Sequence, residues 1–411
     1  METISYQVNG AHRLRVLAVG TLMFCLVSLV SSHAQTLTTL YSFSGPPAGA
    51  GPDGSLIQAK DGNFYGTTGG GGPNCGVDGC GTAFKITPDG TLTTLYNFCS
   101  LPNCADGFFP FAGLIQASDD NFYGTASAGG ASGMGTVFQI TASGTLTTLH
   151  SFDGSDGSAP FGALVQGRDG NFYGTTNAGG AGGGGTVFKM TPTGVLTTLY
   201  NFCFQDSCDH GSSPEAGLVQ GRDGNFYGTT EFGGPFRPPV GTVFKITPSG
   251  TLTTLQDFTN GNGAYPEAGL VQATDGNFYG TTRQGGPNGE GTVFKITSSG
   301  TLTTLYSFAG YPSDGGYPVA ALVQAIDGNF YGTTLGGGTS SDGIIFKITP
   351  TGTLTILQTF DRSNGSDPSG GLVQTIDGSF YGTTSQGGAI GLGTIFRLIV
   401  PHDCIVCPTP K

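Results

Sequence analysis

Short stretches of alternating hydrophobic and polar residues recur along the chain from residue 36 to residue 399. Residues 301–308 read Thr-Leu-Thr-Thr-Leu-Tyr-Ser-Phe, and residues 242–247 read Thr-Val-Phe-Lys-Ile-Thr. Alternation with a period of two is typical of a β-strand that buries one face. The pattern therefore predicts a protein built from many short strands.

The strand candidates belong to a repeat. The stretch Asp-Gly-Asn-Phe-Tyr-Gly-Thr-Thr, or a close variant, occurs seven times at intervals of about 53 residues. The unit from 214 to 258 contains four strand candidates, joined in pairs by tight turns at 221–224 and 248–250. Four strands per repeat of this length are typical of a β-propeller blade. A β-helix or an elongated β array is the alternative, but its rungs would be shorter and would lack the two hairpin turns.

The two ends of the repeat region favour a closed ring. Residues 36–43 form a fourth strand with no blade before it, and the last unit stops after its third strand at 394–399. In a ring these two strands lie side by side, so the first completes the seventh blade and leaves no exposed edge. We therefore expect an all-β, seven-bladed propeller over residues 35–400, followed by a short tail, residues 401–411.

The composition supports this fold class. The 411 residues include 75 Gly and 23 Pro, which argues against a helical protein. Only 10% of residues are charged, but 37% are hydrophobic and 11% aromatic, too many for a disordered chain. Because Trp is absent, we expect Phe, Tyr and aliphatic residues to form the core.

Residues 1–34 differ from the rest of the chain. Arg13 and Arg15 precede an apolar run at 16–30, and Ser32 and Ala34 supply the small residues of a cleavage site. This is typical of a secretory signal peptide, and the run is short for a membrane span, which needs roughly 20 residues. We expect a secreted protein, extracellular or periplasmic, with no membrane span after cleavage.

The charge balance limits the partners. Loss of Glu2, Arg13 and Arg15 with the leader changes the net charge from −12 to −13. An acidic chain is a poor partner for nucleic acid and favours cations or cationic partners. An ordinary solvated surface is the alternative explanation. We expect a monomer.

The repeated stretches Gly-Leu-Val-Gln, Asp-Gly-Asn-Phe-Tyr-Gly-Thr-Thr, Gly-Thr-Val-Phe-Lys-Ile-Thr and Gly-Thr-Leu-Thr-Thr-Leu cover residues 36–399. They resemble the GloVer (Gloeobacter/Verrucomicrobia) tandem-repeat family of exported bacterial proteins. The resemblance implies a secreted or surface-attached propeller without an assigned activity or catalytic residues. Family members often end in an anchoring segment, and residues 400–411 show no apolar span or sorting motif, which favours a released protein.

The connections between strands fall into two classes. The first–second and third–fourth hairpin turns are nearly identical in every copy, whereas the other connections, on the opposite face of the ring, vary in length and carry many acidic residues. Variable loops on a rigid scaffold are where binding normally resides. We expect the variable, acidic loop face to be the functional one.

One variable position is the sharpest candidate. It directly follows the proline before each innermost strand, near the mouth of the central channel. Carboxylates at Asp53, Glu215 and Glu267 are consistent with a Ca²⁺ site, an acid/base pair for glycoside chemistry, or three solvated rim charges. This position is occupied in turn by Asp53, Phe111, Phe161, Glu215, Glu267, Val319 and Ser369.

Other residues that recur in every copy have an architectural interpretation. A Gln in each innermost strand, such as Gln220, predicts amide hydrogen bonds between strands, and each Phe-Tyr pair predicts packing between blades. Six of the seven copies carry a Lys or Arg in the third strand, and the remaining copy has Gln139. We expect this basic side chain to be solvated or to contact a neighbouring blade.

Eight cysteines remain after the leader. In an exported protein, close pairs are expected to form disulfides that stiffen the loops. For the last pair a redox or zinc half-site is the alternative. The pairs are Cys75 and Cys80, Cys99 and Cys104, Cys203 and Cys208, and Cys404 and Cys407.

No nucleophile elbow, P-loop, zinc-protease motif or dinucleotide fingerprint occurs in the chain. The sequence favours a non-enzymatic binding or scaffold module for an extracellular glycan or protein. The alternative is a propeller enzyme acting on a polysaccharide or lactone, with Asp53, Glu215 and Glu267 at the channel mouth as metal ligands or acid/base groups.

Overall fold

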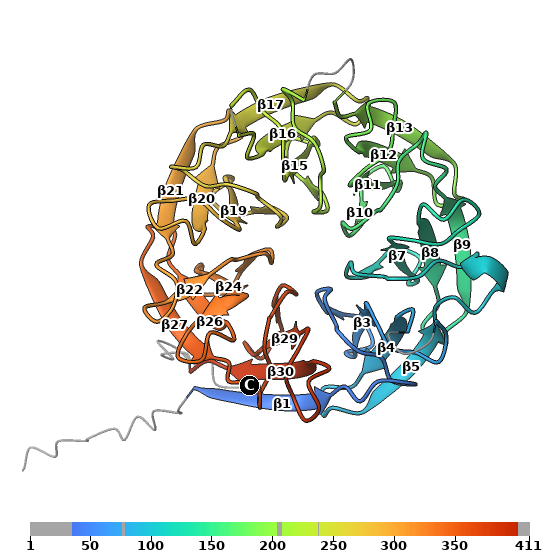
Figure 1. Cartoon of the computed structure of the whole chain (residues 1–411), viewed down its shortest axis with the longest axis horizontal. Coiled ribbons are helices and arrows are strands. Elements are labelled where there is room, and N and C mark those ends of the chain that lie inside the picture. The colour runs from blue at the N-terminus through green and yellow to red at the C-terminus, as the bar shows by residue number, and fades with distance from the viewer. Residues whose placement is uncertain (1–34, 76–78, 204–207, 237, 402–411) are drawn as a thin grey trace, which may run out of the picture. The chain divides into compact units, whose positions relative to one another are not determined.

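The computed structural model describes residues 35–75, 79–203, 208–236 and 238–401. They form seven four-stranded antiparallel sheets, arranged as blades around a central channel (Figure 1). The predicted seven-bladed β-propeller is confirmed. The predicted leader, residues 1–34, and the pair Cys404 and Cys407 lie outside the described residues.

Each blade contains four strands, A to D, from the channel outward. The A strands are β2 (Ile57–Gln58), β6 (Ile115–Gln116), β10 (Val165–Gln166), β14 (Val219–Gln220), β18 (Val271–Gln272), β23 (Val323–Gln324) and β28 (Val373–Gln374). The B strands are β3 (Phe64–Thr68), β7 (Phe122–Ala126), β11 (Phe172–Thr176), β15 (Phe226–Thr230), β19 (Phe278–Thr282), β24 (Phe330–Thr334) and β29 (Phe380–Thr384).

The two outer strands of each blade are longer on average. The C strands are β4 (Thr82–Ile86), β8 (Thr136–Ile140), β12 (Thr186–Met190), β16 (Thr242–Ile246), β20 (Thr292–Ile296), β26 (Ile344–Ile348) and β30 (Thr394–Ile399). The D strands are β5 (Leu92–Asn97), β9 (Leu146–Ser151), β13 (Leu196–Asn201), β17 (Leu252–Asp257), β21 (Leu302–Ser307), β27 (Leu354–Thr359) and β1 (Thr36–Ser42).

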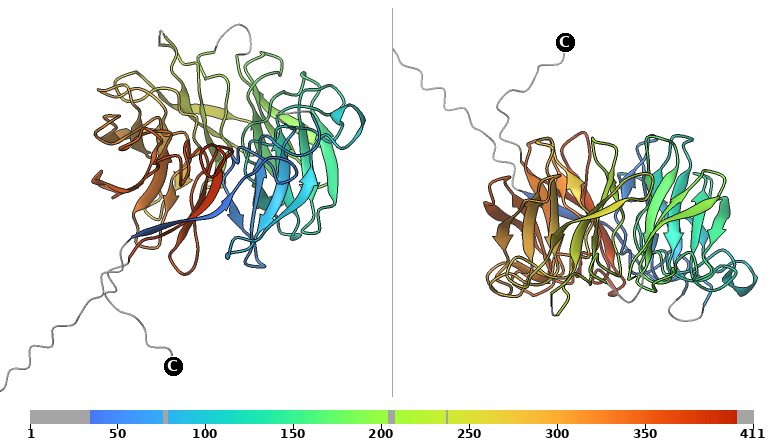
Figure 2. Two further views of the ribbon diagram at one scale, coloured as in Figure 1. Left: turned by 60° about the horizontal axis from the view of Figure 1, so that its bottom comes forward. Right: turned by 90° about the horizontal axis from the view of Figure 1, so that it is seen from above.

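Little else is regular. A small sheet pairs β22 (Gly315–Gly316) with β25 (Gly336–Gly337), and Pro102–Cys104 form a short 3-10 helix, η1. Among the described residues, no helix has the length and hydropathy that a membrane crossing requires. The long loops gather on one face of the ring, as the edge-on view in Figure 2 shows.

The ring closes through its first strand. β1 pairs with β30 in an antiparallel register that runs from Thr36 opposite Ile399 to Ser42 opposite Thr394. The seventh blade therefore has the order β1-β30-β29-β28, with one strand from the beginning of the repeat region and three from its end. This confirms the predicted closure, which pairs the outer edge of β30.

Aromatic residues of the B strands join the blades. In every blade the Tyr of strand B packs on the Phe of strand B in the next blade, with ring centroids 3.9–4.2 Å apart. Tyr381 of the last blade packs on Phe64 of the first, so the stacks form a complete circle. These side chains are almost fully buried. The interpretation of the Phe-Tyr pairs as core packing between blades is confirmed.

The repeated Gln links neighbouring blades by its amide. The side chain of Gln116 donates to the carbonyl of Asp120 in its own turn and accepts from the backbone N–H of Lys60 in the preceding blade. The same acceptor bond occurs at six of the seven blade junctions. The predicted amide hydrogen bonds are therefore present.

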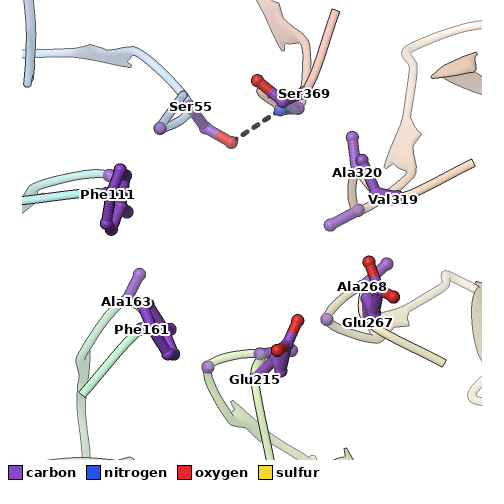
Figure 3. A pocket seen from close by; sticks show the side chains of 18 of the residues that line it. Ser55, Phe111, Phe161, Ala163, Glu215, Glu267, Ala268, Val319, Ala320 and Ser369 are labelled. Carbon is purple, nitrogen blue, oxygen red and sulfur yellow. Dashed lines mark hydrogen bonds between the residues drawn. The ribbon is translucent and has the colours of Figure 1, made fainter. Parts of the chain in front are cut away.

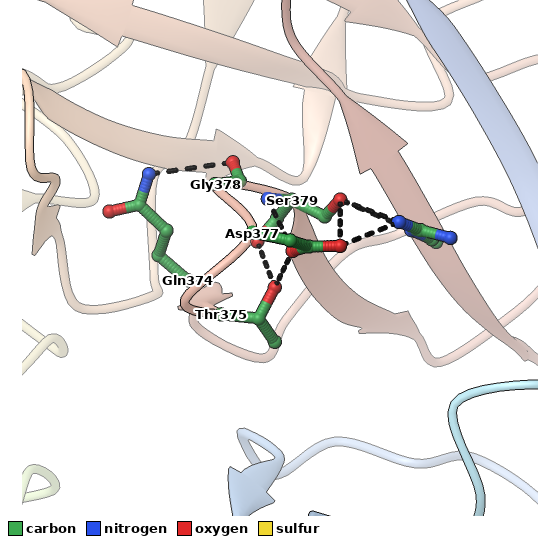
Figure 4. Close-up of polar contacts among 6 residues, drawn as sticks. Gln374, Thr375, Asp377, Gly378 and Ser379 are labelled. Atoms are coloured by element: carbon green, nitrogen blue, oxygen red, sulfur yellow. Dashed lines mark hydrogen bonds and ion pairs between the residues drawn. The ribbon is translucent and has the colours of Figure 1, made fainter. Parts of the chain in front are cut away.

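The aspartate of each repeat organises the A–B turn. In the last blade, Asp377 accepts from the backbone N–H of Ser379 at 3.0 Å and pairs with Arg397 of strand C at 2.8 Å (Figure 4). At the equivalent Asp327, burial alone would raise the pKa, but hydrogen bonds from Asn329 and Lys347 hold it at about 2. The repeated Asp thus stabilises the A–B turn, and the Arg or Lys of strand C forms its ion pair within the same blade.

Candidate functional site

The position after each repeat proline lies at the channel mouth. Each proline packs on a glycine of the preceding blade so closely that a Cβ on that glycine would come within 2.5–2.9 Å of the proline Cδ. This packing brings the seven following side chains to a cavity of about 490 Å³ (Figure 3). All three predicted carboxylates line that cavity together with Phe111, Phe161, Val319 and Ser369.

One side of the cavity is aromatic. Phe111 and Phe161 come from the second and third blades, and their ring centroids are 5.9 Å apart. Phe109 stacks on Phe111 from behind, at 5.8 Å. Both cavity rings are only partly buried, so part of each remains accessible at the mouth.

Next to the aromatic side lies an arc of charges, which we define as Glu215, Glu231, Glu267 and Arg283; of these, Glu215 and Glu267 line the cavity. The Nη1 atom of Arg283 donates to Oε1 of Glu267 at 2.9 Å, and the carboxyl groups of Glu215 and Glu231 are near enough to shift each other's pKa. Asn177 extends the arc with a long contact to Glu215, at 3.5 Å. One arginine thus faces three carboxylates, and the arc retains a negative balance.

Sequence reasoning missed two members of this arc. Glu231 and Arg283 directly follow strand B of the fourth and fifth blades, where the end of strand B lies beside the residue that begins strand A. The available signal was variation at this second position after otherwise uniform strands. Its occupants are Gly69, Ser127, Asn177, Glu231, Arg283, Leu335 and Ser385.

The arc favours proton uptake. Burial and the charge of Glu267 raise the pKa of Glu215. Burial, together with the charges of Glu215 and Glu267, raises the pKa of Glu231 to about 8. The Glu215–Glu231 pair therefore holds a proton at neutral pH.

Asp53 lies apart from the arc. It belongs to the first blade, whereas Glu215 and Glu267 begin the fourth and fifth, so it occupies another sector of the ring. Its Oδ1 atom accepts from Ser369 at 3.2 Å, and burial raises its pKa to about 6. The three predicted carboxylates share one cavity, but the carboxylates in mutual contact are those of the arc.

A second cavity adjoins the first. It has a volume of about 470 Å³ and shares Asp53 and Phe111 with the channel mouth. Its other walls come from loops of the first, second and seventh blades, including Pro46 and Leu392. The two cavities are therefore neighbours on the variable loop face, with Asp53 and Phe111 between them.

A family model described as the Gloeobacter/Verrucomicrobia repeat matches residues 25–209 and 203–396. The chain belongs to this family. The matched residues extend into all seven blades and end within β30, so the resemblance carried by the repeated stretches is confirmed. No curated protein matches this Gloeobacter/Verrucomicrobia repeat chain.

Two solved structures share the fold of this family member. The extracellular domains of two putative hybrid two-component systems of B. thetaiotaomicron are 13% and 10% identical, with TM-scores of 0.56 and 0.57. Each alignment covers 88% of this chain but only 41% and 39% of the other, so the chain spans about two fifths of those structures. A putative 6-phosphogluconolactonase from Bacteroides uniformis is 19% identical, with a TM-score of 0.49 over 77% of this chain and 85% of the other.

Three of the four predicted cysteine pairs fall within the described residues of the repeat protein. The structure joins Cys75 to Cys80, Cys99 to Cys104, and Cys203 to Cys208 as disulfides. The first lies in the B–C loop of the first blade, and the other two follow the D strands β5 and β13. All three are in variable loops, as the sequence predicts.

The proton held by the arc predicts a pH-dependent stability. Glu231 is protonated in the folded chain up to about pH 8, whereas an unperturbed Glu titrates at 4.5. Because the folded state binds more protons between these values, stability falls as pH rises through that window. Glu231→Gln should remove this loss and stabilise the chain by about 1 kcal/mol at pH 9, after allowance for solvent screening, with no gain at pH 4.

Urea unfolding of both chains at several pH values measures this difference. Glu290→Gln, a change outside the arc, is the matched control and should show the pH dependence of the unmodified chain. An equal stabilisation by Glu231→Gln at pH 4 and pH 9 would contradict the assignment of the proton.

Proposed function

We propose that this chain is an exported, non-enzymatic binding module that takes a saccharide chain at the channel mouth on its acidic loop face. The observation that carries the proposal is the cavity that Phe111 and Phe161 line together with the carboxylates of Glu215 and Glu267. Ligand sites are typically concave, with apolar walls and a few placed polar groups.

The two walls suit the two faces of a sugar ring. The C–H face of a pyranose is apolar and stacks on an aromatic ring, while its hydroxyls donate to carboxylate oxygens in charge-assisted hydrogen bonds. Phe111 supplies the ring, and Glu215 and Asp53 supply acceptors. The adjoining cavity gives room for further sugar units, which favours a chain over a monosaccharide.

The setting of the site supports a role outside the cell. The leader and the disulfide-joined loops favour export. The two solved structures with TM-scores above 0.5 are extracellular domains. At 13% and 10% identity they support the fold alone, and their location agrees with the proposed setting. An extracellular protein segment is the second ligand class that an acidic recess accommodates.

The enzymatic alternative has less support. Retaining and inverting glycosidases separate their two carboxyl groups by about 5–5.5 and 6.5–9.5 Å. The two carboxylates in the arc that most strongly affect each other, Glu215 and Glu231, have pKa values raised by burial, and Glu267 is paired with Arg283, so neither arrangement is the separated acid and nucleophile or base that these mechanisms use. The lactonase-like structure has a TM-score of only 0.49 and adds nothing to this alternative.

Calcium remains part of the proposal. Ca²⁺ takes six to eight oxygen ligands, and of the three predicted residues only Glu215 and Glu267 belong to the arc. A bound Ca²⁺ would compete with Arg283 for Glu267 and displace the proton shared by Glu215 and Glu231.

Retention on polysaccharides tests the proposed function. The chain from Gln35 is passed over a panel of extracellular and plant polysaccharides, with and without Ca²⁺, and retained protein and released sugar are both measured. We expect retention without product, and about tenfold weaker retention for Phe111→Ala and for Glu215→Gln. Ile326→Ser, a change at an 85% exposed residue in an A–B turn, is the matched control.

The outcomes separate the candidates. Release of soluble sugar would overturn the proposal that the protein is not an enzyme. Equal retention of the Phe111→Ala, Ile326→Ser and unmodified chains would show that the polysaccharide binds outside the cavity. A rise in melting temperature with Ca²⁺ that Glu215→Gln abolishes would support the metal site, and an unchanged melt would remove it.

A further inference from the structure

Two of the disulfides lie together in the first blade. Cys75 and Cys80 belong to its B–C loop, and Cys99 and Cys104 follow its D strand, β5. All four Sγ atoms lie within 4.8 Å of one another. Within the described part of the chain, no other group of three or more His, Cys, Asp or Glu ligand atoms is gathered in this way.

The arrangement approaches that of a metal–thiolate centre. Zn²⁺ binds four cysteine sulfurs tetrahedrally at about 2.3 Å, which places the sulfurs about 3.8 Å apart. After reduction, the two sulfurs of each pair must separate from the bonded distance of about 2.0 Å to about 3.8 Å, whereas sulfurs of different pairs already lie within 4.8 Å. Two neighbouring disulfides do not require all four sulfurs to converge, because each pair bonds within its own loop.

We propose that Cys75, Cys80, Cys99 and Cys104 form a tetrathiolate Zn²⁺ site in the reduced chain. The surroundings suit such a centre. Cys80 is only 1% exposed and packs in the same hydrophobic cluster as Phe98, so water is excluded from one side. The zinc form would tie the B–C loop to the connection that leads into the second blade, whereas each disulfide closes only its own short loop.

Conversion of the two disulfides into the zinc site requires a reductant and releases protons. Each disulfide accepts two electrons and two protons from a dithiol reductant, which becomes a cyclic disulfide, and yields two thiols. Binding of Zn²⁺ then releases up to four protons as the thiols become thiolates. The two forms correspond to a reducing compartment before export and an oxidising one after it.

Metal binding by the reduced chain tests the proposal. The chain from Gln35 is reduced with dithiothreitol in mild denaturant, refolded without oxygen in the presence of Co²⁺ or Zn²⁺, and freed of excess metal. We expect one metal ion per chain at this site, and for Co²⁺ the absorption bands of a tetrahedral thiolate complex. Cys80→Ser should abolish both signals.

The other cysteine pairs supply matched controls. Replacement of Cys203 and Cys208, or of Cys404 and Cys407, by Ser should leave the metal content and the Co²⁺ spectrum unchanged. If Cys80→Ser does not fold, the exposed Cys75→Ser provides the same test. The proposal is overturned if a chain that retains only Cys75, Cys80, Cys99 and Cys104 holds no metal, or if the Co²⁺ thiolate bands persist when one of these four is replaced.

Discussion

Removal of β1 is expected to destabilise the propeller more than any single substitution. A chain that begins at Ser44 lacks the strand that pairs with β30 over its whole length. It also lacks Phe43, which is 1% exposed and packs edge-on against Phe84 at 5.6 Å. Loss of one buried Phe side chain alone costs about 3–5 kcal/mol, and a domain has only about 5–15 kcal/mol in total.

The truncated chain should therefore melt much earlier and associate through the exposed edge of β30. Thermal unfolding by circular dichroism and gel filtration measure the two effects. Phe308→Ala removes the equivalent Phe of the fifth blade, where the ring is not opened, and is the matched control. It should lower stability by about 3–5 kcal/mol but leave a monomer.

A peptide of residues 35–43 should restore part of the stability when added to the truncated chain, because binding to the folded state alone stabilises it. If the truncated chain stays monomeric and melts within a few degrees of the full chain, closure by β1 contributes little. That result would mean that the Tyr–Phe circle holds the ring together without its last strand pair.

The sequence allowed the ring to be predicted because its determinants are local. Each hairpin turn, alternation of residues and aromatic pair lies within one repeat, and copying a blade seven times leaves little choice of architecture. The closure of the ring could be predicted because the repeat region begins with a fourth strand that has no blade before it and ends with a blade that lacks its fourth strand. These features required no knowledge of which distant residues meet.

The candidate site could be predicted only in part because it is assembled between blades. Asp53, Glu215 and Glu267 were found from one variable position, and all line the channel mouth. Glu231 and Arg283 belong to a different strand end, and only the structure shows that this position meets its neighbours in the arc. The four converging cysteines depend in the same way on two loops of one blade approaching each other.

Gly185→Ala is the substitution expected to disturb both the fold and the cavity at the channel mouth. Gly185 has a φ of +93°, a region that L residues avoid, and a Cβ there would lie 2.2 Å from the carbonyl oxygen of Thr176. It would also lie 2.9 Å from Cδ of Pro214, which precedes Glu215. Backbone atoms cannot move aside as a flexible side chain does, so we expect the free energy of unfolding to fall by about 2–4 kcal/mol.

Gly183→Ala separates backbone strain from crowding. Gly183 has a φ of +76°, but a Cβ there meets nothing within 4 Å. Strain alone should cost about 1 kcal/mol, without an effect on ligand retention. Urea unfolding of both variants and their retention on the best polysaccharide of the panel measure the contrast. Equal losses of stability would show that the φ angle alone requires glycine here, and equal retention would show that the contact between Gly185 and Pro214 does not position Glu215.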